Sequence, residues 1–324
     1  AQHYVEIFRS IPSSNYKILT IVDKEINKSK KLASYLNCKF SNNYESLLND
    51  RDINLIIILT PSGTHYQQAR IALKKGFNIL VEKPLAMKPS EIQELVKISK
   101  KEKKILSVAF QNRLNPSIKI AKELLKNKKF GKIISSSVRL RWCRFQDYYD
   151  DGWHGTWSMD GGVLNQQAIH HLDAINYLLG NVKSVSAFST KRLNRLEAED
   201  TLVSILNFKD GSLGTIEATT AARPIDLEAS LSITGENGYI DISGVALNKI
   251  KSIKYKNQKM TSKELSRKYS QKVKNGYGFS HRELLLNIFK FIKGKKTYIS
   301  DGLESLHTSR IIHSIYESVD QKKT

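Results

Sequence analysis

The feature that most constrains the fold is a short apolar segment that ends in a charged pair and a proline. Residues 77–84 read Phe-Asn-Ile-Leu-Val-Glu-Lys-Pro. The run from Ile79 to Val81 is typical of a strand buried inside a parallel sheet. Open α/β sheets bind ligands at the carboxyl ends of such strands. Lys83 stands at that end, before a turn imposed by Pro84. A strand that ends in an ordinary polar turn is the alternative interpretation.

Strands alternate with helices over the first third of the chain. The pattern predicts helices at Ile26 to Leu36, Thr64 to Lys75 and Pro89 to Lys101, and further strands at Tyr16 to Val22, Leu55 to Leu59 and Ile105 to Phe110. This alternation indicates βαβ units and therefore a Rossmann-like, doubly wound parallel sheet. We assign this α/β domain to residues 1–112.

The remaining residues, 113–324, are predicted to form an α+β domain with a mostly antiparallel sheet. Its strands are expected at residues 132–144, 182–190, 201–208, 212–219, 227–234 and 239–242, and its helices at 116–126, 162–179, 281–292 and 303–318. Asp210-Gly211 is a hairpin signal. Residues 249–274 are polar, and we expect them to be a mobile excursion outside the core.

Composition excludes several classes of protein. The 324 residues suit two domains, and no apolar run approaches the roughly 20 residues of a membrane span. Lys and Arg outnumber Asp and Glu by 52 to 31, but the basic residues are spread along the chain. We therefore expect biased composition rather than nucleic-acid binding, with a surface that still attracts an anionic substrate. Without a recognisable signal peptide, and with only Cys38 and Cys143, a cytoplasmic protein with reduced thiols is expected.

A polar run within the predicted helix 162–179 suggests acid–base chemistry. Gln166 and His170 are four residues apart and share a helix face. Oxidation of an alcohol requires a base for the hydroxyl proton, and histidine titrates near neutrality. A nearby lysine, such as Lys83, would share that proton. A purely structural histidine is the alternative.

A metal site is the rival interpretation of the same run. His170, His171 and Asp173 are all potential metal ligands. Adjacent histidines point to different faces of a helix. We therefore expect no metal site here.

An acid, Asp23, follows the predicted strand Tyr16 to Val22. In dinucleotide-binding folds an acid at this place accepts hydrogen bonds from the adenosine ribose, and a glycine-rich fingerprint lies about 20 residues before it. No G-x-G-x-x-G occurs between Ala1 and Asp23. We expect the first strand and its phosphate-binding loop to be missing from an N-terminally truncated domain. The alternative is a capping acid in a fold that binds no dinucleotide.

Several separate segments together resemble the Gfo/Idh/MocA oxidoreductase family over almost the whole chain. They are Thr60-Pro61, His65, residues 76–84, Gly161-Gly162-Val163-Leu164 and His170-His171-Leu172-Asp173. The resemblance implies an N-terminal NAD(P)-binding Rossmann domain and the oxidation or reduction of sugars and cyclitols. It also implies that Lys83 is the active-site lysine, that His170 is the catalytic histidine, and that Asp23 selects NAD.

The resemblance and the chain order together define the expected site. Cofactor contacts are expected from Asp23, Thr60, Pro61, His65, Glu82, Lys83 and Gln111. Substrate contacts are expected from Arg113, Asn165, Tyr277 and His281. Arg113 would bind a carboxylate or phosphate, with a surface salt bridge as the alternative.

The chain departs from the family at one catalytic position, where Gln166 replaces an aspartate that the family often has. Because glutamine cannot take up a proton, Gln166 would only orient, and His170 and Lys83 would do more of the acid–base work. The amides around Gln166, with Gly155-Thr156-Trp157 before them, look more like the branch that acts on UDP-N-acetyl-sugar uronates for surface polysaccharides.

The sequence thus predicts an NAD-dependent oxidoreductase of a sugar or nucleotide-sugar CH–OH group. We expect a homo-oligomer that associates through the C-terminal sheet, without nucleic-acid or membrane partners. Two alternatives remain open: an enzyme of a free polyol such as inositol, and a non-catalytic sensor that binds a dinucleotide.

Overall fold

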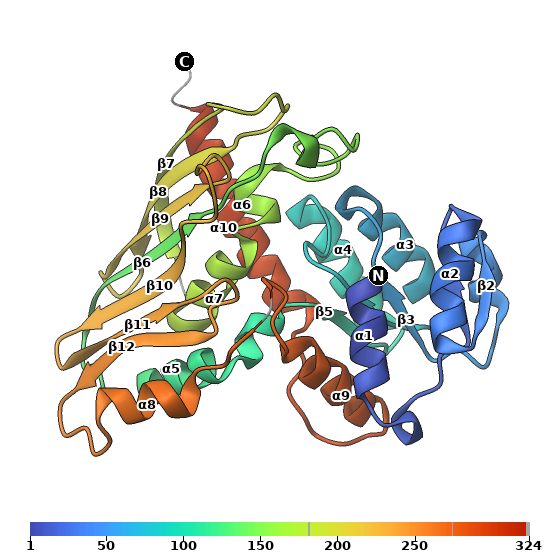
Figure 1. The fold of residues 1–324 in the computed structure, drawn as a ribbon, viewed down its shortest axis with the longest axis horizontal. Coiled ribbons are helices and arrows are strands. Elements are labelled where there is room, and N and C mark those ends of the chain that lie inside the picture. The colour runs from blue at the N-terminus through green and yellow to red at the C-terminus, as the bar shows by residue number, and fades with distance from the viewer. Residues whose placement is uncertain (181, 274, 322–324) are drawn as a thin grey trace.

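The structure, a computed structural model, describes residues 1–180, 182–273 and 275–321. It has two halves that lie side by side (Figure 1). The N-terminal half holds short parallel strands and their helices. The C-terminal half is a large sheet with helices between it and the N-terminal half. This arrangement agrees with the predicted fold class.

The N-terminal half contains five strands, all paired in parallel. They are β1 (Thr20–Val22), β2 (Lys39–Ser41), β3 (Leu55–Ile58), β4 (Asn78–Val81) and β5 (Leu106–Val108). Their helices are α1 (Gln2–Ser10), α2 (Ile26–Leu36), α3 (His65–Lys74) and α4 (Pro89–Lys101), with 3₁₀ turns at Ser13–Asn15, Tyr44–Asn49, Ser62–Thr64 and Gln111–Leu114. The predicted strands and helices are present, and the sequence reading missed β2.

These strands form two sheets rather than one. The first has the order β1-β2 and the second β3-β4-β5. Residues of both β1 and β3 line one cavity of about 1570 Å³, together with side chains of α1 and α2. Along the part of the chain that the structure describes, β1 therefore pairs with one strand only. The same is true of β3, and the edges of both strands border this cavity.

The C-terminal half is built on a seven-stranded sheet of order β12-β11-β10-β6-β9-β8-β7. Only β6 and β9 pair in parallel among the pairings described. The strands are β6 (Ile133–Arg141), β7 (Val182–Thr190), β8 (Thr201–Phe208), β9 (Leu213–Thr219), β10 (Glu228–Gly235), β11 (Gly238–Ser243) and β12 (Lys249–Tyr255). The helices are α5 (Pro116–Lys126), α6 (Gly162–Gln166), α7 (Ile169–Leu179), α8 (Ser262–Tyr269), α9 (Ser280–Ile292) and α10 (Gly302–Asp320).

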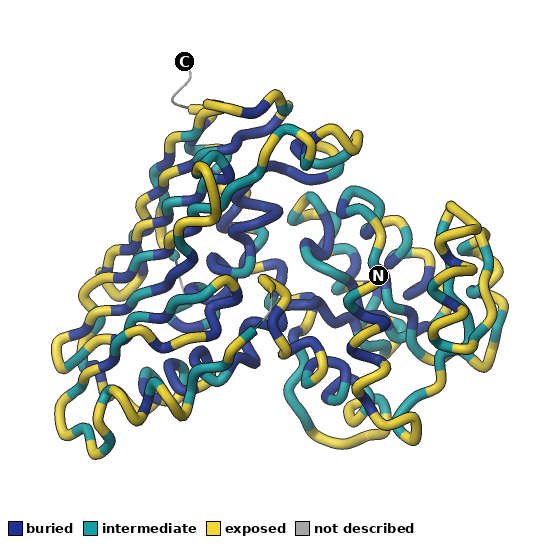
Figure 2. The backbone as a smooth tube through the Cα atoms, in the orientation of Figure 1, coloured by how far each residue is buried: buried dark blue, intermediate teal, exposed yellow. Residues whose placement is uncertain are grey.

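The helices cover one face of this sheet and leave the other open. Strand residues alternate between buried and exposed, as β8 shows, because successive side chains point to opposite faces. Figure 2 shows the alternation as dark blue and yellow along the outer strands. No helix among the described residues has the length and hydropathy needed to cross a membrane.

Two expectations about elements are wrong. The predicted helix 162–179 is two helices, because α6 ends at Gln166 and α7 begins at Ile169. Residues 249–274 are not an excursion outside the core: β12 pairs with β11, and α8 buries Leu265. The prediction failed because polar residues dominate this segment, although each element buries at least one apolar side chain. Residue 274 lies outside the described residues.

The C-terminal segment returns to the N-terminal half. The backbone N–H of Val108 in β5 donates to the carbonyl oxygen of Ser300 at 2.9 Å, and α9 packs against α1. A boundary at residue 112 therefore separates the sheets, but residues 280–301 contact the first half. The assignment of 113–324 to one domain stays a prediction.

Arg113, in the turn Gln111–Leu114 at the boundary, ties that turn to elements of the C-terminal half. Its Nε and Nη2 donate to both carboxylate oxygens of Asp173 at 2.7 and 2.6 Å. Its Nη1 donates to Glu304 at 2.5 Å and to the Tyr298 hydroxyl at 3.0 Å. The side chains of Arg113 and Asp173 are each 2 % exposed. The expected substrate contact is therefore corrected: this guanidinium is buried and fully occupied by structural partners.

Replacing Arg113 by methionine should strongly destabilise the protein. The change leaves the Asp173 carboxylate buried and unpaired, which typically costs about 3–5 kcal/mol. Urea unfolding measures the loss. Arg70→Met is the matched control, because the Arg70–Glu94 pair lies at the surface, where ion pairs contribute little. Equal stability of the two variants would contradict the structural role of Arg113.

Candidate active site

Lys83 connects the two halves at the carboxyl end of β4. Its ammonium donates to the backbone oxygen of Gln166 at 2.7 Å and to the side-chain oxygen Oε1 of Gln166 at 2.8 Å. The helix α6 ends at Gln166, and the last carbonyls of a helix lack partners within it. The break between α6 and α7 therefore supplies one of the two acceptors. The Lys83–Pro84 bond is cis.

Burial lowers the pKa of Lys83, and the negative charges of Glu82 and Asp160 act in the opposite direction. Such an ammonium gives up or shares a proton more readily than a surface lysine does. The amide of Gln166 fixes where it points. The orienting role expected for Gln166 stays a prediction.

The start of α6 is fixed by glycine. Gly162 has a φ of +79°, and a Cβ at that position would lie 1.9 Å from Oε2 of Glu199. Only glycine allows this approach. Burial raises the pKa of Glu199 to about 8, so the carboxyl is neutral at neutral pH. Its Oε1 accepts from the N–H of Leu164 and from the Tyr316 hydroxyl.

His170 lies in the first turn of α7, where the charge of Lys83 affects its pKa. Burial, and then the positive charge of Lys83, hold the pKa of His170 well below its usual range. The imidazole is therefore neutral near pH 7, the form that accepts a proton. Its Nδ1 is buried without a hydrogen-bond partner in the part of the chain described. The ring packs edge-on against Phe110.

Glu82 and His281, expected to contact cofactor and substrate, contact each other. The distance from His281 Nε2 to Glu82 Oε1 is 3.3 Å, and the Tyr4 hydroxyl donates to the same oxygen at 2.8 Å. Burial alone would raise the pKa of Glu82, but His281, Lys83 and Tyr4 bring it down to about 2. Tyr277 is exposed and stacks on His3, with the ring centroids 4.7 Å apart.

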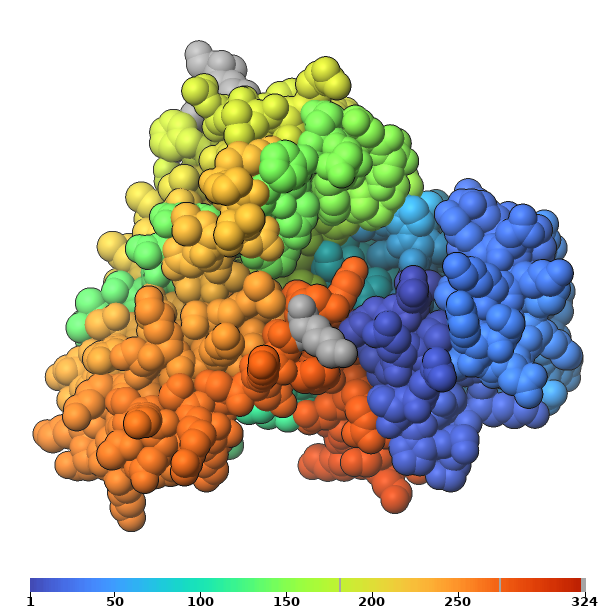
Figure 3. Space-filling model, in the orientation of Figure 1, coloured from blue at the N-terminus to red at the C-terminus, as the bar shows by residue number. Residues whose placement is uncertain are grey.

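The other expected cofactor residues divide into two groups. Asp23, Thr60 and Pro61 line the large cavity between β1 and β3, and its rim includes Trp153 of the C-terminal half. Figure 3 shows the surface hollowed where the blue and green segments meet. His65 is buried, with Nε2 2.7 Å from the Thr60 carbonyl oxygen and Nδ1 2.7 Å from that of Pro84. It therefore positions the backbone beside the cavity.

The remaining expected contacts, Gln111 and Asn165, are buried. Gln111 has a side-chain oxygen without a hydrogen-bond partner among the described residues. The Asn165 side chain donates to the Asp160 carbonyl oxygen at 2.9 Å. Asn165 thus braces the loop before α6, and its assignment to the substrate stays a prediction.

The sequence reading missed Asp160, which immediately precedes Gly161-Gly162. Its Oδ2 accepts from the Gly155 N–H at 2.7 Å, while Oδ1 is buried without a partner in the described ranges. Burial raises the pKa of Asp160 to about 6, against the opposing effects of the Gly155 N–H and the Lys83 charge. The sequence signal that could have identified Asp160 is a carboxyl next to two glycines, since a glycine pair lets other groups approach the backbone closely.

Comparisons with known proteins agree with this geometry. The family model "Oxidoreductase family, NAD-binding Rossmann fold" matches residues 2–110, and the model of the family's C-terminal alpha/beta domain matches residues 122–324. One similar structure is the WlbA dehydrogenase of Bordetella pertussis, solved with NADH and UDP-GlcNAcA. It has a TM-score of 0.93 at 28% identity, and the match covers 99% of this chain and 92% of the WlbA chain. The WlbA dehydrogenase of Chromobacterium violaceum, solved with the same ligands, has a TM-score of 0.91 at 30% identity, with 99% and 91% covered.

A curated relative is more distant. Levoglucosan dehydrogenase of Pseudarthrobacter phenanthrenivorans is 27% identical over 229 residues. The match takes in 62% of this chain and 58% of the relative. The chain therefore spans less than two thirds of that protein.

Replacing Asp160 by asparagine should make stability less dependent on pH. In the folded protein the pKa of Asp160 lies near 6, above the usual 3.8. As pH rises from about 4 to 6, the unfolded chain releases this proton before the folded protein does, so the wild type loses stability. The Asp160→Asn variant has no carboxyl to titrate and avoids this loss, which reaches on the order of 3 kcal/mol above pH 6.

Urea unfolding of both proteins between pH 4 and 8 tests this expectation. Asp147→Asn, at an exposed position of the same loop, is the matched control. If the free energies of unfolding of wild type and Asp160→Asn change in parallel over the whole pH range, the raised pKa of Asp160 is refuted.

Proposed function

Because the chain belongs to the Gfo/Idh/MocA oxidoreductase family, we propose that it is an NAD-dependent oxidoreductase of a CH–OH group on a sugar or nucleotide-sugar. One observation carries the proposal. The Lys83 ammonium is held by Gln166 across the two halves, within the electrostatic reach of a neutral His170. A base and a polarising cation therefore face one site from different halves of the protein.

The residues divide the acid–base work. His170 accepts the proton of the substrate hydroxyl on Nε2, because Nδ1 is enclosed. The Lys83 ammonium donates a hydrogen bond to the same substrate oxygen and stabilises the negative charge that grows on it. Gln166 keeps the ammonium in place. Bound NAD supplies the hydride acceptor.

The cavity between β1 and β3 fits the cofactor by the chemistry of its lining. It is lined by apolar strand residues and by the Asp23 carboxylate at the end of β1. That carboxylate would accept hydrogen bonds from ribose hydroxyls. Thr60 and Pro61, after β3, would border the cofactor on the way to Lys83.

The substrate is proposed to be a nucleotide-sugar uronate. Two similar structures hold UDP-GlcNAcA, and the formal net charge of +21 favours an anionic substrate. A free polyol is the second candidate, supported by the likeness to levoglucosan dehydrogenase. The alternative of a non-catalytic sensor differs from both candidates, because a sensor would bind the dinucleotide without turning over a substrate.

We also propose that the open face of the large sheet joins copies of this chain. Val203, Ile205 and Leu213 are 49%, 52% and 54% exposed on that face. Neighbouring β8 and β9 present them together. Apolar side chains gathered on one sheet face favour association.

Substitution of the two central residues should abolish most turnover. His170→Ala removes the base, a role typically worth about 10²–10⁴-fold in rate. Lys83→Ala should also lower kcat, and the double variant should lose less than the product of the single losses, because the two act as a unit. Gln166→Ala should cost less, since Gln166 only orients Lys83. NADH formation with UDP-sugar uronates and polyols is the measurement.

Two results would count against this assignment. Full activity of His170→Ala would show that another group is the base. Tight NAD binding by the wild type without turnover of any substrate would favour the sensor. His313→Ala, an exposed histidine of α10, is the matched control for histidine replacement.

Cofactor choice should depend on Asp23. Its carboxylate would repel the 2′-phosphate of NADP, so NAD is expected to bind more tightly. Asp23→Ser should narrow this preference by removing the negative charge. Calorimetric titration with both cofactors measures it, and Glu45→Ser, at an exposed position of the same half that does not line the cavity, serves as the control. Tighter binding of NADP to the wild type would contradict the placement of Asp23.

A further inference from the structure

An arginine just beyond β6 lies on the side of the sheet that carries the helices. Val138 and Leu140 of β6 are buried on that side, whereas Arg139 and Arg141 point to the opposite face. The alternation continues past the strand end, where Trp142 packs edge-on against His171 of α7. Arg144 follows Trp142 by two residues and therefore shares its side.

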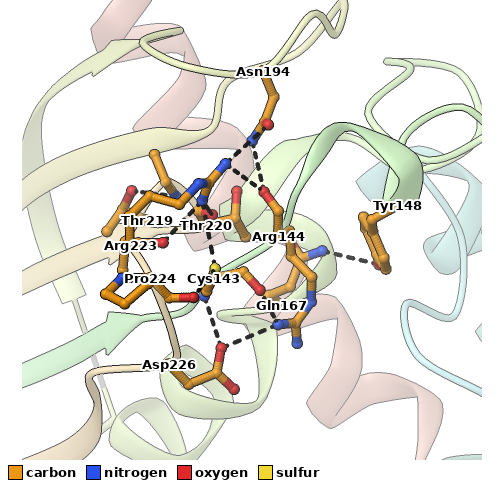
Figure 4. Close-up of polar contacts among 12 residues, drawn as sticks. Cys143, Arg144, Tyr148, Gln167, Asn194, Thr219, Thr220, Arg223, Pro224 and Asp226 are labelled. Carbon is orange, nitrogen blue, oxygen red and sulfur yellow. Dashed lines mark hydrogen bonds and ion pairs between the residues drawn. The ribbon is translucent and has the colours of Figure 1, made fainter.

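The guanidinium of Arg144 is held by neighbours but not used up by them. It lies 5.0 Å from the ring centroid of Trp142 and 5.6 Å from that of Tyr148. Its Nη1 donates to the Cys143 carbonyl oxygen at 2.7 Å and to Asp226 at 3.2 Å (Figure 4). Within the described residues, no hydrogen bond forms at its Nε or Nη2. The side chain is 26% exposed, so part of it is accessible to a ligand.

Arg223 beside it is more fully used. Its Nη1 and Nη2 donate to the carbonyl oxygens of Thr220, Ala222 and Arg144 and to the Asn194 side chain. Arg223 therefore braces the loop after β9, whereas Arg144 keeps both Nε and Nη2 unpartnered among the described residues.

The cluster adjoins the candidate active site. The Tyr148 hydroxyl accepts from Nε2 of Gln167 at 3.1 Å, and Gln167 follows the residue that holds Lys83. His154 also packs against Tyr148, with the rings tilted and their centroids 4.1 Å apart. Burial, and further the charges of Lys83 and Arg144, lower the pKa of His154, while Asp151 opposes them. One histidine thus lies within reach of both cations.

A hollow of about 410 Å³ opens beyond Trp142 and Asp226, and Arg144 is not among the residues that line it. Asp226 is the acid paired with the guanidinium, and its Oδ1 already accepts from the Cys143 N–H and from Arg144.

We propose that Arg144 recognises an anionic group of the substrate, with Nε and Nη2 as paired donors. This inference rests on the proposed function, which it deepens by assigning a residue to substrate selection. Two parallel N–H groups match the two oxygens of a carboxylate or of a phosphate. The aromatic rings keep the fork in place before the ligand arrives, which reduces the entropy lost on binding.

The test compares three ligands that differ in their anionic groups. UDP-N-acetylglucosaminuronate carries a carboxylate and a diphosphate, UDP-N-acetylglucosamine has the diphosphate without the carboxylate, and UDP lacks the sugar. Calorimetry gives Kd for each with wild type, Arg144→Gln and Arg144→Lys. We expect Arg144→Gln to weaken uronate binding by about tenfold or more, as for a lost charged hydrogen bond. Arg144→Lys should restore part of it, because lysine keeps the charge but not the fork.

The ligand pattern identifies the group that is bound. A loss confined to the uronate assigns Arg144 to the carboxylate, and an equal loss for all three ligands assigns it to the diphosphate. Arg139→Gln, on the opposite face of the same strand, should bind like the wild type. Thermal unfolding and NAD affinity show that each variant is folded.

Unchanged affinity of Arg144→Gln for all three ligands would overturn the inference, as would failure of the wild type to bind any of them. The proposed function fails separately, if the wild type binds the uronate but forms no NADH from it. Loss of binding in Arg144→Gln with turnover by the wild type supports both.

Discussion

The bond from the Lys83 ammonium to Gln166 is the interaction on which the candidate site depends. It spans 83 positions of the sequence and joins the end of a buried strand to the end of a short helix. A partly buried ammonium must be solvated by the protein, because an unpaired charge in the interior is costly. Two oxygens of a single residue accept its hydrogen bonds, and the negative charges of Glu82 and Asp160 act on it as well. The lysine therefore remains a cation with a lowered pKa, suited to proton chemistry.

Other buried charges around the site are compensated in different ways. Arg113 is neutralised by a two-pronged pair with Asp173, which makes it structural. Against the opposing effect of burial, hydrogen bonds from His281 and Tyr4, together with the charge of Lys83, lower the pKa of Glu82 to about 2, so Glu82 stays ionised. Asp160 and Glu199 have no such cation in contact, and burial raises the pKa of both. Carboxyls within one region thus differ in protonation because their partners differ, which is how one site can hold a base and an acid at a single pH.

Much of the architecture follows from patterns that act over short distances. The apolar runs of β3 and β4, the proline at the first position of α4 and α5, and the alternation of β8 and β9 each predict an element that the structure contains. Strand β2 was missed because it is three residues long and largely exposed. The break at Gln166 was missed because nothing in the local sequence interrupts the helical pattern there; the contacts of Lys83 and Glu199 decide it.

For the site, the sequence by itself determined the residue types and their places at strand and helix ends: Lys83 after β4, His170 beside the Gly161-Gly162 turn, and Asp23 after β1. These are local facts, set by the periodicity of side chains and by turn residues. Only the tertiary structure decided which charges meet. Arg113 pairs with Asp173 rather than facing solvent, His281 contacts Glu82, and two donor groups of Arg144 lack a protein partner among the described residues. Such pairings join residues far apart in the chain, and burial decides their energies, so no local pattern specifies them.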